Sequence, residues 1–139
     1  MKGIRNFIVF ALFFIVTPFV FSEVTSYWRN LPARLQHAFL FQPVALGYVF
    51  ATLSEAAGAG IAAFILAIPL TWLVRSRPLL LALFLGLAAA VTILPDLYLL
   101  VRFSQVRLVV VQLPALVSFF LLSWFFAVWV TTHLGQRAA

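Results

Sequence analysis

A chain of 139 residues in which 65% are hydrophobic and only 9% are charged has the composition of an integral membrane protein, since soluble domains carry about a quarter charged residues. Its length allows a single domain, 1–139, and leaves no room for a separate catalytic domain. The net charge of +6 does not indicate a nucleic-acid partner, because the basic residues stand singly or in pairs at the ends of apolar runs, where they reach lipid headgroups. Unsatisfied peptide groups are not tolerated in hydrocarbon, so we expect an all-α, polytopic membrane protein with four transmembrane helices in contact with the lipid bilayer.

The first predicted span, 7–27, follows a short basic start. The same run could serve as a signal peptide, because Val20 and Ser22 form a small-residue cleavage pattern. We interpret it as a retained first helix, with Tyr27 and Trp28 at the headgroup level.

A less apolar segment, 30–42, separates the first span from the second. Leu31, Leu35 and Phe39 fall at helical spacing while Arg34 lies on another face, a pattern typical of a short helix lying in the membrane interface. An irregular loop between two spans fits the same residues equally well.

The second predicted span, 49–74, belongs to the apolar stretch 43–74, which exceeds the ~20 residues needed to cross a bilayer. A short turn containing two arginines leads to the third span, 78–101, and another short connection leads to the fourth, 108–132. Short connections favour antiparallel neighbours, so we predict two antiparallel hairpins.

The distribution of basic residues weakly favours one orientation. With the N terminus inside, five of them are cytoplasmic and four are external, which is a small positive-inside bias. The basic start favours the same orientation, so we predict a multi-pass protein of the bacterial inner membrane with both termini in the cytoplasm. The cytoplasmic set is Lys2, Arg5, Arg75, Arg77 and Arg137, and the external set is Arg29, Arg34, Arg102 and Arg107.

Two acids interrupt the apolar runs on either side of the arginine turn. Glu55 lies 21 residues before Ser76, and Asp96 lies 20 residues after it, so in an antiparallel hairpin the two carboxyl groups reach nearly the same depth. Counting back from Arg75 at ~1.5 Å per residue, a helix has crossed ~30 Å of hydrocarbon when it reaches Glu55. The pair is therefore expected near the outer surface. An intramembrane carboxylate costs roughly 2.5 to 3.5 kcal/mol and is therefore usually paired or functional.

Glu55 lies on a face of small residues. Gly58, Ala59 and Ala62 follow it by three, four and seven positions and so share its side of a helix. Ser54 and Gly58 also fit the small-xxx-small pattern that lets two membrane helices approach closely. We predict that Ser54, Gly58, Ala59 and Ala62 form a helix-packing face and that Glu55 points away from lipid.

Asp96 follows Pro95, which cannot donate a backbone hydrogen bond and clashes with the preceding turn. The third helix should therefore kink beside the acid. Thr92, one turn earlier, is placed to form a hydrogen bond with one of the backbone groups that the kink frees.

Three interpretations of the acidic pair stay open. The two carboxyl groups share a proton or bind a cation near the mouth of a pathway. Alternatively, they pair with the outer arginines Arg34, Arg102 or Arg107 and hold the hairpin or a partner subunit together. In the third interpretation, both reach the headgroup region and are solvated.

The residue inventory argues against metal and catalytic chemistry. Cysteine is absent and the chain has three acids, so thiolate chemistry and disulfides are excluded and a metal centre is not expected. His37 and His133 are predicted at opposite faces of the membrane, and no Ser, His and acid constellation is evident. We expect no cofactor, no metal and no enzymatic activity.

The stretch from Ala51 to Arg77, ATLSEAAGAGIAAFILAIPLTWLVRSR, resembles an early core helix of the permeases of binding-protein-dependent ABC transporters and covers about a fifth of the chain. Those permeases carry an EAA motif in a hydrophilic coupling loop, whereas Glu55-Ala56-Ala57 lies in an apolar run here. Four spans and the absence of such a loop also depart from the permease pattern, so the resemblance assigns no residue roles.

These observations favour a non-enzymatic inner-membrane protein that acts as a subunit, assembly factor or protective partner of another membrane protein or complex, or as a homo-oligomer. With almost no extramembrane mass, the chain offers mainly helix faces for recognition. The alternative is a small oligomeric ion-coupled or proton-coupled transporter or channel that uses Glu55 and Asp96.

Overall fold

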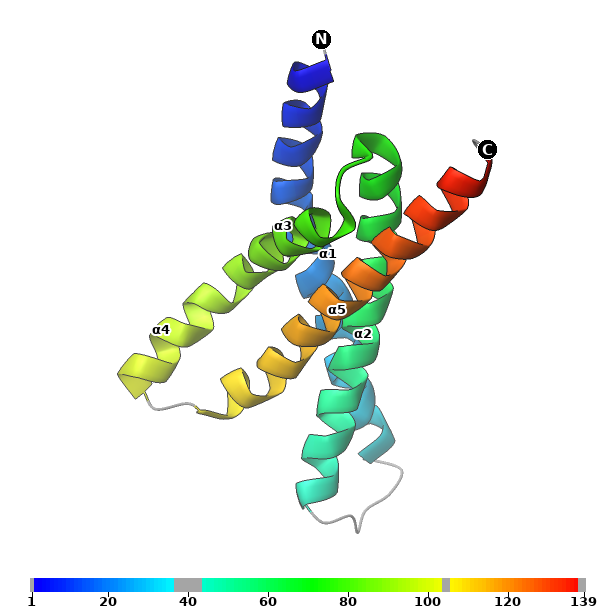
Figure 1. The fold of residues 1–139 in the computed structure, drawn as a ribbon. Helices are drawn as coiled ribbons and strands as arrows, with labels where there is room; N and C mark the ends of the chain where they lie inside the picture. The colour runs from blue at the N-terminus through cyan, green and yellow to red at the C-terminus, as the bar shows by residue number, and fades with distance from the viewer. Residues whose placement is uncertain (1, 37–43, 104–105, 138–139) are drawn as a thin grey trace.

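The computed structural model describes residues 2–36, 44–103 and 106–137, and every element within these ranges is helical (Figure 1). This confirms the all-α prediction. In chain order the elements are α1 (Lys2–Gln36), α2 (Val44–Val74), α3 (Pro78–Ala90), the 3-10 turn η1 (Val91–Ile93), α4 (Leu94–Phe103) and α5 (Val106–Arg137).

Within the described ranges, three helical segments are long and apolar enough to cross a bilayer, namely Lys2–Tyr27, Thr52–Val74 and Gln112–His133. The third predicted span, 78–101, is represented by a shorter apolar helix, Pro78–Ile93, followed by α4. Length and hydropathy thus support a multi-pass membrane protein with three full-length candidate spans and one shorter apolar helix.

The predicted interfacial helix does not start as a separate element. The first helix, α1, continues through residues 30–36 and ends at Gln36, and the rest of the segment, 37–43, lies outside the described residues. Extending an existing helix adds one hydrogen bond per residue, whereas starting a new one requires a costly nucleus. Helix α1 thus continues through Pro32, although proline lacks a backbone N–H and removes one hydrogen bond from this part of the helix.

The turn between α2 and α3 follows the sequence prediction in detail. Arg75 adopts a left-handed conformation with φ of 47°, and its backbone N–H donates to the Thr71 carbonyl at 3.1 Å, so it ends α2 in the manner of a C-terminal cap. Pro78 then occupies the first turn of α3, where its missing N–H costs nothing.

The hydrogen-bonding pattern of the third helical path changes one turn before Pro95. Over η1 the N–H of Leu94 donates to the carbonyl of Val91, which is the carbonyl that residue 95 would use in a regular α-helix. Because proline has no N–H, the chain tightens into a 3-10 turn here. Thr92 donates its hydroxyl to the Ala89 carbonyl at 2.7 Å.

The packing order differs from the sequence order. Helices α1 and α2 run in opposite directions and pack together, α2 also packs along α5, and α3 packs chiefly on α5 (Figure 1). The sequence predicted a hairpin of the second and third helices, yet α2 and α3 meet only sparsely. After the Arg75 turn, α3 leaves α2 and lies against α5.

Helix α5 separates α2 from α3. A Cβ added to Gly60 of α2 would meet the Leu122 side chain at 3.0 Å, and one added to Gly86 of α3 would meet the Phe120 ring at 3.3 Å. Residues 120 and 122 lie on nearly opposite sides of a helix. Two glycines thus let α5 insert bulky side chains on both of its sides.

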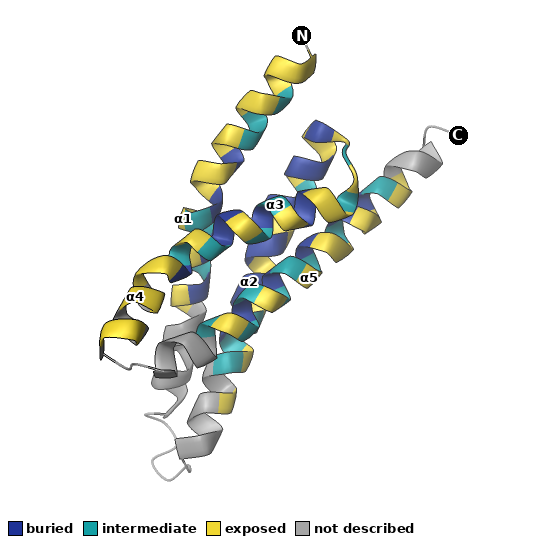
Figure 2. Cartoon of the chain, turned by 60° about the vertical axis from the view of Figure 1, so that its left-hand side comes forward, coloured by how far each residue is buried: buried dark blue, intermediate teal, exposed yellow. Residues whose placement is uncertain are grey.

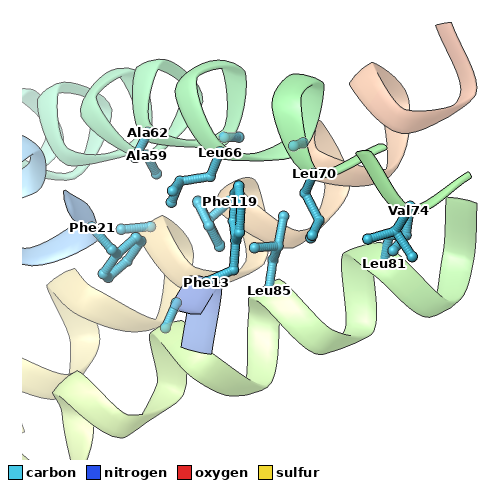
Figure 3. Packing of buried hydrophobic residues seen from close by; sticks show 14 residues of the cluster. Phe13, Phe21, Ala59, Ala62, Leu66, Leu70, Val74, Leu81, Leu85 and Phe119 are labelled. Carbon is cyan, nitrogen blue, oxygen red and sulfur yellow. The ribbon is translucent and has the colours of Figure 1, made fainter. Parts of the chain in front are cut away.

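The core lies where these helices cross, and α2 supplies more of its buried residues than any other helix (Figures 2 and 3). Phe119 of α5 is fully buried and packs in the same cluster as Phe21 of α1, with their rings edge to face at 5.0 Å. The small residues Ala59 and Ala62 of α2 are fully buried in this cluster, which allows close helix approach.

Candidate functional site

Glu55 is fully buried, with 0% of its surface exposed. Gly58, Ala59 and Ala62, which share its helix face, are buried as well, whereas Ser54 is half-buried. The acid therefore points into the bundle from the small-residue side of α2.

A pocket of about 140 Å³ opens beside Glu55. Helices α1, α2 and α5 and the 3-10 turn η1 all contribute to it, so four segments distant in sequence build one site. Most of its walls carry hydroxyl, amide or carboxyl groups. The lining residues are Phe21, Ser22, Thr25, Ser26, Glu55, Thr92, Gln112 and Ala115.

The α1 wall of the pocket is a hydroxyl-bearing face. Ser22, Thr25 and Ser26 are spaced by three and four positions and so project from one side of the helix. Thr25 is buried and donates its hydroxyl to the Phe21 carbonyl at 2.6 Å. Ser22 and Ser26 are exposed, so the pocket reaches the surface of the bundle along α1.

The opposite wall comes from the irregular part of the third helical path. Thr92 belongs to η1, and its hydroxyl proton is already donated to Ala89. The tightened turn caused by Pro95 thus brings a hydroxyl oxygen to the pocket. Gln112 adds an amide group from the first turns of α5.

Asp96 lies on α4, one turn beyond Thr92, and its side chain is outside the part of the chain that the structure describes. The predicted pairing of Asp96 with Glu55 therefore stays a prediction. The side chains of Arg34 and Arg107 are outside the described part as well. Arg102 is exposed, and its guanidinium donates to the Tyr98 hydroxyl at 2.5 Å and lies 5.9 Å from the centre of that ring.

Of the two histidines, the one that the structure describes, His133, does not line this pocket. His37 lies outside the described residues. His133 is exposed near the end of α5, where its Nδ1 lies 2.8 Å from the Trp129 carbonyl and its ring contacts the Trp129 ring. Within the described ranges, no three His, Cys, Asp or Glu side chains come together to hold a metal.

Chemically, the pocket combines one carboxyl group with neutral oxygens. Among the lining residues that the structure describes, Glu55 is the ionisable one. Its carboxyl group can exchange a proton or hold one positive charge.

Sequence reasoning identified Glu55 as a site residue and Thr92 only as a hydrogen-bonding residue beside the Pro95 kink, and it missed Ser22, Thr25 and Gln112. The signal for the α1 residues was available, because three hydroxyl side chains at helical spacing near the end of an apolar run are unusual in a membrane helix. Gln112 gave no comparable signal, since a single amide near a predicted span end is ordinary.

Comparison with known protein families, curated proteins and solved structures finds no match for this chain. The geometry of the pocket and the arrangement of the helices therefore carry the functional argument.

Proposed function

We propose that the chain is a non-enzymatic, four-span protein of the bacterial inner membrane that acts as a subunit, assembly factor or protective partner of another membrane protein. Its spans form two antiparallel hairpins, and both termini are cytoplasmic. The observation that carries this proposal is the uneven burial of the helices.

Half of the residues in an 18-residue apolar stretch of Thr52–Val74 are buried, against 17% in the corresponding stretch of Lys2–Tyr27 and 28% in that of Gln112–His133. Helix α2 is thus enclosed by its neighbours, while α1 and α5 present large apolar faces. On α1 these faces include the exposed rings of Phe7, Phe14 and Phe19. Broad apolar helix faces are suited to contact with lipid tails and with the helices of another membrane protein.

The test places the same bulky side chain, tryptophan, at two exposed positions. Ala11 lies on the exposed side of α1, and Leu87 lies on the exposed side of α3. Lipid tails accommodate a tryptophan at either position. A tightly packed protein interface on α1 does not accommodate a tryptophan at position 11. Each variant is extracted from native membranes in lipid nanodiscs, and native mass spectrometry then gives the composition of the particles.

We expect a complex of fixed stoichiometry for the parent protein and for Leu87→Trp, and its loss for Ala11→Trp. Helix content and monodispersity of the variant proteins serve as folding controls. Isolated single chains in every sample would contradict the proposal, and so would a complex that survives both substitutions.

A second function, a small oligomeric transporter or channel for cations or protons, is favoured by one observation, the complete burial of Glu55 beside a polar pocket. Its test is ion and proton flux into proteoliposomes. Glu55→Gln is compared with Glu23→Gln, because Glu23 is exposed on α1. Flux that Glu55→Gln abolishes and Glu23→Gln preserves would replace the accessory role, whereas flux no higher than in empty liposomes agrees with it.

A further inference from the structure

One end of the bundle carries an excess of positive charge, and its described basic residues are Lys2, Arg5, Arg75 and Arg77. We call these four residues the basic end. We propose that the basic end binds anionic phospholipids of the adjoining leaflet through their headgroup phosphates. This inference goes beyond the partner role proposed above and does not depend on it.

The fold brings two distant segments of the sequence to this end. Lys2 and Arg5 lie in the first turns of α1, and Arg75 and Arg77 belong to the turn between α2 and α3. The start of α1 and the end of α2 lie towards the same end of the bundle (Figure 1). All four side chains are exposed, so a ligand in the surrounding membrane can reach them.

The three acidic residues of the chain belong to parts of the helices remote from the basic end. Glu23 is 18 residues from Arg5 along α1, which corresponds to ~27 Å. Glu55 is 20 residues from Arg75 along α2, which corresponds to ~30 Å. Asp96 belongs to α4, whose last residues lie towards the opposite end (Figure 1). The basic end therefore attracts anions from its surroundings.

The opposite end of the bundle differs in its charge balance. Its four arginines share that end with the three acids, so positive and negative side chains nearly balance there. Anionic headgroups are attracted by clusters of basic residues next to a membrane, and they should therefore prefer the basic end. The four arginines of the opposite end are Arg29, Arg34, Arg102 and Arg107.

Two tryptophans indicate that the basic end lies at the level of lipid headgroups. Trp72 is 61% exposed and precedes Arg75 by less than one turn. Trp129 is also exposed, near the C-terminal end of α5. Exposed tryptophans are enriched at the membrane–water interface, and arginine side chains beside them can reach the phosphates.

The surface next to the basic residues favours a lipid over a free anion. Ile4 and Phe7 flank Arg5 on α1 and are largely exposed, and Leu80, three residues after Arg77, is exposed as well. Apolar side chains beside the cations can contact acyl chains while the phosphate pairs with the arginines. An anion that carries acyl chains thus satisfies both parts of this surface.

The test measures lipid binding to the full chain by native mass spectrometry in a mild detergent. The probes are phosphatidylglycerol, phosphatidylcholine with the same acyl chains, and glycerophosphoglycerol, which is the anionic headgroup without its chains. We expect phosphatidylglycerol to bind saturably and at least about tenfold more tightly than phosphatidylcholine, because several basic residues act on one negative charge. Glycerophosphoglycerol should show no saturable binding in the same concentration range.

Variants at the two ends of the bundle locate the effect. Arg77→Gln should lower the affinity for phosphatidylglycerol by about fivefold, whereas Arg77→Lys keeps the charge and should keep most of the affinity. The double variant Lys2→Gln, Arg5→Gln should lower the affinity at least about tenfold. Arg102→Gln is the matched control, because it removes an exposed arginine from the opposite end and should leave the affinity unchanged.

Equal affinities for phosphatidylglycerol and phosphatidylcholine would overturn the proposal, as would a loss of affinity in Arg102→Gln as large as that in Arg77→Gln. Glycerophosphoglycerol that binds as tightly as the lipid would overturn it as well, because a soluble anion would then be the ligand. Helix content serves as the folding control. If Arg77→Gln does not fold, the three probes on the parent protein and the Lys2→Gln, Arg5→Gln variant still decide the outcome.

Discussion

Hydroxyl side chains buried between the helices differ in how their hydrogen-bonding capacity is met. Thr25 and Thr71 donate to carbonyls one turn earlier in their own helices, both at 2.6 Å. The buried hydroxyl oxygens of Thr17 and Ser123 have no hydrogen-bond partner within the described part of the chain. Such a hydroxyl is desolvated without compensation, which lowers stability.

This contrast predicts opposite effects for the same substitution. Thr17→Val removes an unsatisfied hydroxyl and should raise the free energy of unfolding by about 1 kcal/mol, whereas Thr71→Val removes a made hydrogen bond and should lower it by about 0.5 to 1 kcal/mol. Both threonines are fully buried, so the two variants are matched in environment. Reversible unfolding in mixed micelles measures the difference, and a Thr17→Val protein less stable than Thr71→Val would contradict this account.

At the scale of elements, the position of α5 depends on two glycines. Gly60 and Gly86 admit the side chains of Leu122 and Phe120 from opposite sides of that helix. A Cβ at position 86 would lie 3.3 Å from the Phe120 ring and 3.7 Å from the Phe120 Cβ. A bulkier side chain, whose γ atoms extend further, would force the ring or the helix to move.

Gly86→Val should consequently destabilise the protein by about 1 to 3 kcal/mol through overpacking between α3 and α5. Gly3→Val is the control, because a Cβ at Gly3 meets nothing within 4 Å. Unfolding free energies of the two variants in the same micelles provide the measurement. Similar stabilities for Gly86→Val and Gly3→Val would show that α5 does not lie against α3 in this way.

At the scale of the whole molecule, the ends of the chain and the arginine turn are related by the path of the helices. The N-terminal end of α1, the C-terminal end of α5 and the end of α2 at Val74 lie towards the same end of the bundle (Figure 1). The end of α4 near Arg102 lies towards the other end. The outer ends of α1 and α5 thus lie on one side of the bundle, as any topology with both termini on the same side of a membrane requires.

The proposed orientation predicts which positions react with a membrane-impermeant maleimide. The chain has no cysteine, so the labelling of a single introduced cysteine has no background from other thiols. Val101, beside Arg102, is 85% exposed, and Val101→Cys should be labelled in intact cells, whereas Ser76→Cys should be labelled only after the membrane is permeabilised. The reverse pattern would overturn the orientation.

The helical class, the turn at Arg75 and the small-residue face around Glu55 were predictable from the sequence, because each depends on local chemistry. Apolar length and backbone satisfaction require helices in hydrocarbon, the arginine pair and Pro78 mark a turn, and helical periodicity places Gly58 and Ala59 beside Glu55. The 3-10 turn before Pro95 follows from the missing N–H in the same local way.

The insertion of α5 between α2 and α3 and the assembly of the polar pocket depend on the tertiary structure. In a chain this apolar nearly every helix face is hydrophobic, so periodicity does not indicate which faces meet. Ser22 and Gln112 are separated by 90 positions and line one pocket, and only the packing of the helices brings them to the same site. Glu55 was predictable as a buried acid, but its hydroxyl-lined surroundings come from the way that distant helices pack.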